Sequence, residues 1–217
     1  SARMIALDEQ AHEFAGEPGL VDRILAEGYA RPTILAENVF GFTQDAVHAH
    51  GAFVIDWGEG PGGIQDPAGH RETILNPALS EIGIGILETP NPESSLGPLV
   101  TTQHFGTRAD APAALTGVLT SDADGDAYAD IGEGLGGVTV TAEGAAGTFT
   151  ATSHASGGYT LPLPAGAYTV VFEGGALEGT VARTVEIADD NVKLDIAYLY
   201  AVPEGAILGT RGADAAL

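Results

Sequence analysis

Two patterns of hydrophobic residues divide this chain. In residues 1–57 the apolar positions recur at three- and four-residue spacing, which is typical of amphipathic helices. The clearest helical run is punctuated by Pro18 and Gly28 and comprises Leu20, Val21, Ile24, Leu25 and Tyr29. A second helix is predicted over residues 43–57, with Ala46, Val47, Phe53 and Val54 facing inward. Strands are predicted at 82–87 and 98–105.

From residue 115 onward the helical period disappears and short alternating strands take over. They are predicted at 138–142, 147–152, 159–163, 167–172, 181–187 and 192–198, with glycine-rich turns between them. Even spacing of this kind is typical of an antiparallel β-sandwich. We therefore expect an α+β protein with an N-terminal domain at 1–106, a linker at 107–114, a β-sandwich at 115–200 and an apolar tail at 201–217.

The composition excludes several classes of partner. The chain has 217 residues and a formal net charge of −22, from 30 acidic and 8 basic residues. Such a surface repels nucleic acid and anionic membranes. There is no cysteine, which rules out disulfides and thiolate chemistry. No run of about 18 apolar residues is present, so no membrane insertion is expected. No signal peptide is visible, and the targeting segment of a secreted protein would lie outside this chain.

One acidic segment carries a ligand pattern for a hard cation. Residues 122–133 place side-chain oxygens at positions 1, 3, 5, 9 and 12 of a twelve-residue loop, and a backbone carbonyl at position 7. These positions are Asp122, Asp124, Asp126, Asp130 and Glu133, with Tyr128 supplying the carbonyl. This is the spacing of an EF-hand-type loop, so the sequence predicts a Ca²⁺ site. Ala127 replaces the usual glycine at position 6, and the alternative is a solvated acidic loop.

The N-terminal domain resembles a known family. Its motifs are Gly69-His70-Arg71 followed by Leu75-Asn76-Pro77, Glu81-Ile82-Gly83-Ile84-Gly85, Ala36-Glu37-Asn38, and Asp22-Arg23-Ile24 with Gly28-Tyr29. Over residues 1–106 these motifs resemble the bacterial, cysteine-free branch of the CAP superfamily of cysteine-rich secretory, antigen 5 and pathogenesis-related proteins. The resemblance implies an α-β-α sandwich with a central cavity lined by two histidines and two glutamates.

Carried over by position, the resemblance assigns His70, Glu37 and His12 to that cavity. The second glutamate has no clear counterpart, and Asp56 or Glu59 could serve. Such a cavity could bind Zn²⁺, act in acid–base chemistry, or form a hydrogen-bonded polar cluster without catalytic function. The long helix that usually precedes the residue equivalent to Met4 is missing. We expect either a fragment of a longer polypeptide or a core face covered by another chain.

The C-terminal domain resembles the B-type repeat domains of bacterial surface adhesins. The shared motifs are Gly117-Val118-Leu119, the acidic loop, Gly132 to Val140, and the hairpin Gly158 to Val170. The resemblance implies a Greek-key β-sandwich that binds structural Ca²⁺ and acts as a rigid spacer. The single lysine, Lys193, gives no clear support for the isopeptide bond of some relatives.

These observations favour an extracellular structural or adhesive module over an enzyme. No serine lies in a nucleophile motif, so we assign no catalytic residue, and His104 is interpreted as a structural strand residue. The alternative is a CAP-type hydrolase or protease that uses the His/Glu cavity. Expected partners are further copies of the chain, in an oligomer or polymer, or an extracellular matrix ligand.

Overall fold

The computed structural model describes residues 1–123 and 129–198. The chain forms two units, Ser1–Ala111 and Pro112–Leu217, and the division falls within the stretch 107–114. Buried apolar side chains gather into one cluster in each unit. The units are therefore described one at a time.

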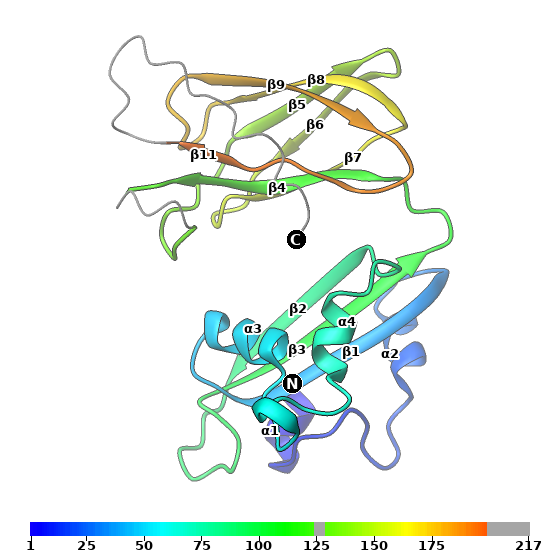
Figure 1. Ribbon diagram of the computed structural model, residues 1–217, viewed down its shortest axis with the longest axis vertical. Helices are drawn as coiled ribbons and strands as arrows, with labels where there is room; N and C mark the ends of the chain where they lie inside the picture. The colour runs from blue at the N-terminus through cyan, green and yellow to red at the C-terminus, as the bar shows by residue number, and fades with distance from the viewer. Residues whose placement is uncertain (124–128, 199–217) are drawn as a thin grey trace. The chain divides into compact units, whose positions relative to one another are not determined.

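The first unit is built on a three-stranded antiparallel sheet in the order β1-β3-β2 (Figure 1). The strands are β1 (Pro32–Thr43), β2 (Glu81–Glu88) and β3 (Leu99–Arg108). The register of β1 against β3 shifts near both ends of β1, whereas β2 pairs with β3 residue by residue along its whole length. The central strand β3 is consequently the best buried of the three, and β2 is an edge strand.

Helices cover both faces of this sheet. They are α1 (Ala2–Leu7), α2 (Leu20–Ala26), α3 (Ala46–Ile55) and α4 (Gly69–Ile74), with a short 3-10 turn η1 (Pro61–Gly63). Met4 of α1 packs with Val39 and Val100 on one face. On the other face Phe53 of α3 lies against Phe40, with ring centroids 6.1 Å apart. The first unit is thus layered, with helices on both sides of a small sheet.

The two predicted helices and two predicted strands of this unit form, with shorter helices than expected. The interval 43–57 contains α3, but Val47, predicted to face inward, is 70% exposed. The burial of Phe53 is as predicted. Sequence analysis missed the twelve-residue strand β1, which includes Glu37 and Asn38.

The second unit contains two four-stranded sheets. One has the order β6-β5-β8-β9; in the other, β4 pairs with β7, β10 and β11. Their bounds are β4 (Ala114–Ser121), β5 (Thr139–Gly144), β6 (Gly147–Thr152), β7 (Gly158–Pro162), β8 (Gly166–Glu173), β9 (Thr180–Ile187), β10 (Val192–Lys193) and β11 (Ile196–Tyr198). One buried cluster takes side chains from both sheets, and the rings of Tyr159 and Phe172 meet edge to face within it.

The expectation of a wholly antiparallel sandwich is wrong in one sheet. The strand predicted at 192–198 is broken into β10 and β11, and both run parallel to β4. The carbonyl of Leu194, between the two pieces, accepts a hydrogen bond from the Tyr159 hydroxyl at 2.7 Å, and the Leu194 amide donates to the backbone carbonyl of Thr116. These hydrogen bonds attach the end of the described chain to β4. The predicted tail at 201–217 lies outside the described residues.

The described part of the chain contains no helix with the length and apolar character needed to cross a membrane.

Candidate functional site

Glu37 is the centre of a polar cluster in the first unit. Its Oε1 lies 2.9 Å from His12 Nδ1, and its Oε2 lies 2.7 Å from His104 Nε2. The guanidinium of Arg23, on α2, approaches Oε2 at 3.6 Å and donates to the backbone carbonyl of His12 at 2.9 Å. The Glu37 side chain is only 5% exposed. One buried carboxylate therefore orients two imidazoles and lies close to the guanidinium of Arg23 on α2.

The surroundings of Glu37 favour its charged form. Burial by itself would raise the pKa of this carboxyl. Hydrogen bonds from His104 and His12 and the charge of Arg23 outweigh that effect, so the pKa of Glu37 lies below its ordinary value. A carboxylate held in this way fixes the ring orientation of both imidazoles.

His70 belongs to a second polar pair with Asp56. The Asp56 carboxylate is completely buried and lies 2.7 Å from His70 Nδ1. It also accepts the backbone amides of His70 and Arg71 at 2.9 and 3.2 Å. The pair adjoins a pocket of about 130 Å³ that Phe40, Phe53 and Trp57 help to line. No described residue bonds to Nε2 of His70, which leaves one imidazole nitrogen available beside this pocket.

The structure brings His12 and Glu37 together but separates both from His70. Successive side chains on a strand point to opposite faces, and Glu37 and Asn38 are neighbours on β1. The Asn38 amide donates to the His70 backbone carbonyl at 3.2 Å, so His70 lies on the face opposite Glu37. The single cavity with Glu37, His12 and His70 that the CAP resemblance implies is therefore not formed. The partner of His70 is Asp56, one of the two acids considered for the unplaced position.

Sequence analysis missed the role of His104. The register pairs Glu37 directly with His104, and His104 with Gly83, so the three residues form one row across β1, β3 and β2. Directly opposed residues of an antiparallel pair share a face. The alternation of His104 with Thr102 on a strand was visible in the sequence, but nothing there indicated that β3 pairs with the segment containing Glu37.

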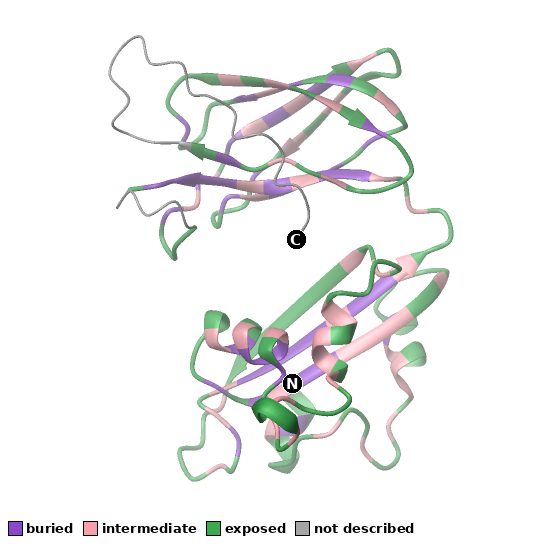
Figure 2. Cartoon of the chain, viewed as in Figure 1, coloured by how far each residue is buried: buried purple, intermediate pink, exposed green. Residues whose placement is uncertain are grey.

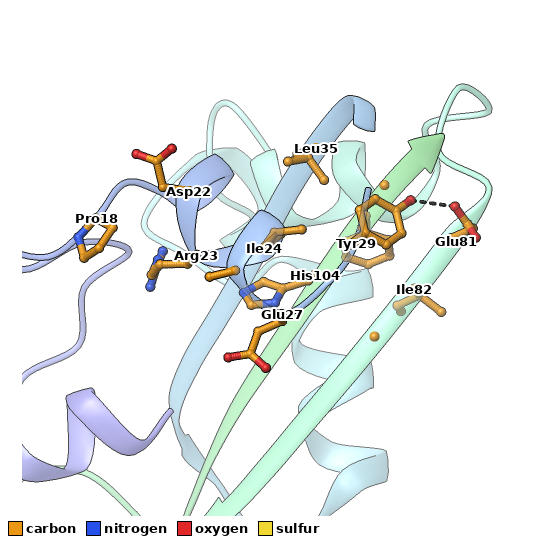
Figure 3. Close-up of a pocket in the computed structure, with 14 residues that line it drawn as sticks. Pro18, Asp22, Arg23, Ile24, Glu27, Tyr29, Leu35, Glu81, Ile82 and His104 are labelled. Atoms are coloured by element: carbon orange, nitrogen blue, oxygen red, sulfur yellow. Dashed lines mark hydrogen bonds between the residues drawn. The ribbon is translucent and has the colours of Figure 1, made fainter. Parts of the chain in front are cut away.

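A pocket of about 600 Å³ lies beside this row, between α2 and the sheet. Figure 3 shows Arg23, Glu27 and His104 on one side of it and the bonded pair Tyr29 and Glu81 on the other. Its remaining lining is largely apolar and includes Ile24, Leu35, Ile82 and Phe105. A pocket of this size and character is typical of a binding site for an apolar group with a few polar contacts.

Tyr29 closes one end of this pocket through a fixed hydrogen bond. Its hydroxyl donates to Glu81 at 2.6 Å, and Arg108 donates to the same carboxylate. Burial, and then the hydrogen bond to Glu81 and the charge of that residue, raise the pKa of Tyr29 to about 12. Arg108 is the main cause of a lowered pKa at Glu81. Tyr29 is thus a neutral hydrogen-bond donor at physiological pH.

The predicted calcium loop lies in the second unit, between β4 and β5. Asp122 and Glu133, at its first and last ligand positions, are each 8% exposed. One Glu133 oxygen accepts the Ala123 amide at 2.7 Å, and the other accepts the Asp130 amide at 3.1 Å. Asp130 itself is exposed. The predicted ligands Asp124, Asp126 and Tyr128 lie outside the described residues.

Within residues 1–123 and 129–198, no group of three or more histidine, aspartate and glutamate side chains has an arrangement suited to a metal ion. At Glu37, each imidazole presents a nitrogen to a carboxylate oxygen, which is a hydrogen-bonded arrangement. No protein-family model matches the chain, and no curated protein matches it.

Proposed function

We propose that this protein is an extracellular structural or adhesive module that Ca²⁺ stiffens through the loop at 122–133, with a non-catalytic first unit. The observation that carries the proposal is the Glu133 carboxylate. It is buried beside Asp122 and holds backbone amides from both parts of the described loop. A bidentate glutamate at the last position of a calcium loop has to occupy the same kind of central position. The β-sandwich provides the rigid frame.

The chemistry of such a loop supports an extracellular setting. Acidic oxygen-ligand loops in extracellular modules often bind Ca²⁺ weakly and are filled by the high Ca²⁺ concentration outside cells. The large negative charge of the chain is consistent with a surface that binds divalent cations, because counter-charges reduce its self-repulsion.

Thermal unfolding with and without Ca²⁺ tests this proposal. Binding to the native state should stabilise it by about 2.7 kcal/mol at a Ca²⁺ concentration a hundred times Kd. EDTA should lower the unfolding midpoint of the second unit, and Glu133→Gln should abolish the difference between Ca²⁺ and EDTA. Glu143→Gln removes an exposed carboxylate on β5 and serves as the matched control. Equal midpoints in Ca²⁺ and EDTA would contradict the calcium site.

Assembly is the second component of the proposal and has its own test. Light scattering on the full chain, with and without Ca²⁺, should reveal an oligomer or polymer if copies associate. A stable monomer at high concentration in Ca²⁺ would rule out self-assembly and leave adhesion to another molecule as the function of the module.

Hydrolysis is a second candidate function, and the Asp56–His70 pair favours it. A buried carboxylate that holds one imidazole nitrogen leaves the other nitrogen as a base for an attacking water. A panel of peptides and esters should then show turnover that His70→Ala abolishes and that Asp56→Asn reduces with a changed pH profile. His50→Ala alters an exposed histidine on α3 and should leave the turnover unchanged. Absence of turnover across the panel would support the non-catalytic proposal.

A further inference from the structure

The edge strand β2 of the first unit is unusually open. Seven of its eight residues are exposed, and it appears green along nearly its whole length in Figure 2. Within the described chain it pairs with β3 alone. The row Ile82, Ile84 and Ile86 is 53%, 58% and 38% exposed on one face. Few soluble proteins expose so regular an apolar strand without a partner for it.

This strand carries none of the features that usually protect a sheet edge. It has no lysine, no proline and no break in register against β3. Its charges are confined to the two ends, at Glu81 and Glu88. The backbone N–H and C=O groups on its outer side can therefore accept another strand over the full length of β2.

The opposite face of β2 offers space for side chains from such a strand. Gly83 and Gly85 occupy that face, and a Cβ at either position would meet no atom within 4 Å. Neither glycine has a positive φ, so the backbone does not require glycine there. Glycine within a strand reduces stability and often marks a place where a ligand approaches closely. Gly83 also lines the 600 Å³ pocket next to His104.

Charge decides which kind of strand fits. Two copies of the chain would each bring a net charge of −22 to the interface, and that repulsion opposes pairing of β2 with itself. Asp22 and Glu27 of α2 also lie at the pocket, and neither forms an ion pair with a described residue. A basic partner is therefore favoured over a second copy.

We propose that β2 binds an extended segment of another protein by strand addition. The segment is apolar at alternate positions, carries a large or aromatic side chain opposite Gly83, and is flanked by lysine or arginine. Backbone hydrogen bonds to β2 hold the segment, and its aromatic side chain enters the pocket between His104 and Tyr29. Its basic flanks meet Glu88 at one strand end and Asp22 and Glu27 on α2, whereas Glu81 is already paired with Arg108. This binding is independent of the calcium loop.

The test uses a synthetic peptide of alternating valine and threonine, with a central tyrosine and two lysines at each end. Fluorescence anisotropy on the full chain should show saturable binding, equal in Ca²⁺ and in EDTA. A peptide methylated at alternate backbone nitrogens, and one with glutamates in place of the lysines, should each bind at least tenfold more weakly. Equal binding of the methylated peptide, or no binding of the parent peptide, would overturn the proposal.

The matching protein variant is Gly83→Val, which fills the space above the strand. A β-branched residue suits a strand better than glycine, so the thermal midpoint should not fall, while peptide affinity should decrease at least tenfold. Thr150→Val on the edge strand β6 of the second unit is the control and should leave affinity unchanged. Unchanged affinity in Gly83→Val would overturn the proposal that the peptide's aromatic side chain enters the pocket. Self-association through β2 in place of peptide binding would assign the edge to a second copy.

Discussion

At the scale of single residues, the Glu37 carboxylate has three charged or ionisable partners in the part of the chain that the structure describes. His12, His104 and Arg23 all approach its buried carboxylate. We predict that Glu37→Gln reduces the free energy of unfolding by about 1–3 kcal/mol at neutral pH, because the buried carboxylate no longer accepts charge-assisted hydrogen bonds from its partners. Glu9→Gln, at an exposed position, is the control.

The pH dependence of this effect follows from the lowered pKa of Glu37. Since the native pKa lies below the ordinary value of 4.5, the contribution is present above about pH 4.5 and is lost as pH falls through the native pKa. Urea unfolding at a series of pH values should show the wild type and Glu37→Gln converging in acid. A difference that stays constant from neutral to acidic pH would show that the charge of Glu37 is not the cause.

Sequence reasoning found several of the right residues but not their grouping. His12, Glu37, His70 and Asp56 were all candidates, and the structure makes two pairs of them on opposite sides of a sheet. Motif spacing identifies polar residues, but strand alternation decides which way each points. Placing Glu37 and Asn38 on a strand would have predicted that their side chains point to opposite faces, but not that His70 lies on the face of Asn38. His104 joins Glu37 only through the register of β1 against β3, which no local pattern encodes.

At the scale of elements, strand bounds were predicted best where one face of a strand is buried and the other is exposed to solvent. The interval 147–152 matches β6, and β5, β7, β8 and β9 lie within two residues of their predicted bounds. Strand β1 was missed because helices cover both faces of its sheet, so clean alternation is absent and polar residues occur at its middle. The break between β10 and β11 depends on how this segment pairs with β4, which is distant in sequence.

The close contact between Leu194 and β4 leads to a prediction at Gly117. A Cβ at this position would lie 2.0 Å from the carbonyl oxygen of Leu194, which Tyr159 and Thr116 hold in place. We predict that Gly117→Ala destabilises the second unit by about 1–3 kcal/mol, because the backbone must shift to admit a methyl group. Chemical denaturation of the variant gives the measurement.

The control for Gly117 is Gly158, which pairs one residue away, opposite Val118. A Cβ there has only the Ser156 hydroxyl near it, at 3.8 Å, so Gly158→Ala should be neutral or slightly stabilising. If both variants were equally destabilising, strand glycines in general would explain the loss, and the close approach of Leu194 would not.

At the scale of the whole molecule, charge dominates. Thirty acidic residues against eight basic ones leave many carboxylates on the surface of a 217-residue chain. Mutual repulsion of like charges reduces the stability of a compact state, and dissolved salt screens that repulsion. Raising ionic strength from 0.01 to 0.15 M shortens the Debye length from about 30 Å to about 8 Å. A nonspecific salt effect is therefore expected in addition to the calcium site.

The two effects can be separated in one experiment. NaCl should raise the unfolding midpoints of the wild type and of Glu133→Gln by equal amounts, because screening acts on the whole surface and one charge changes it little. Replacing part of the NaCl with CaCl₂ at constant ionic strength should then raise only the wild-type midpoint, since Glu133 is a ligand in the proposed site. An equal response of both proteins to CaCl₂ would show that Ca²⁺ acts only by screening charge. A midpoint that NaCl does not raise would show that self-repulsion has little effect on stability.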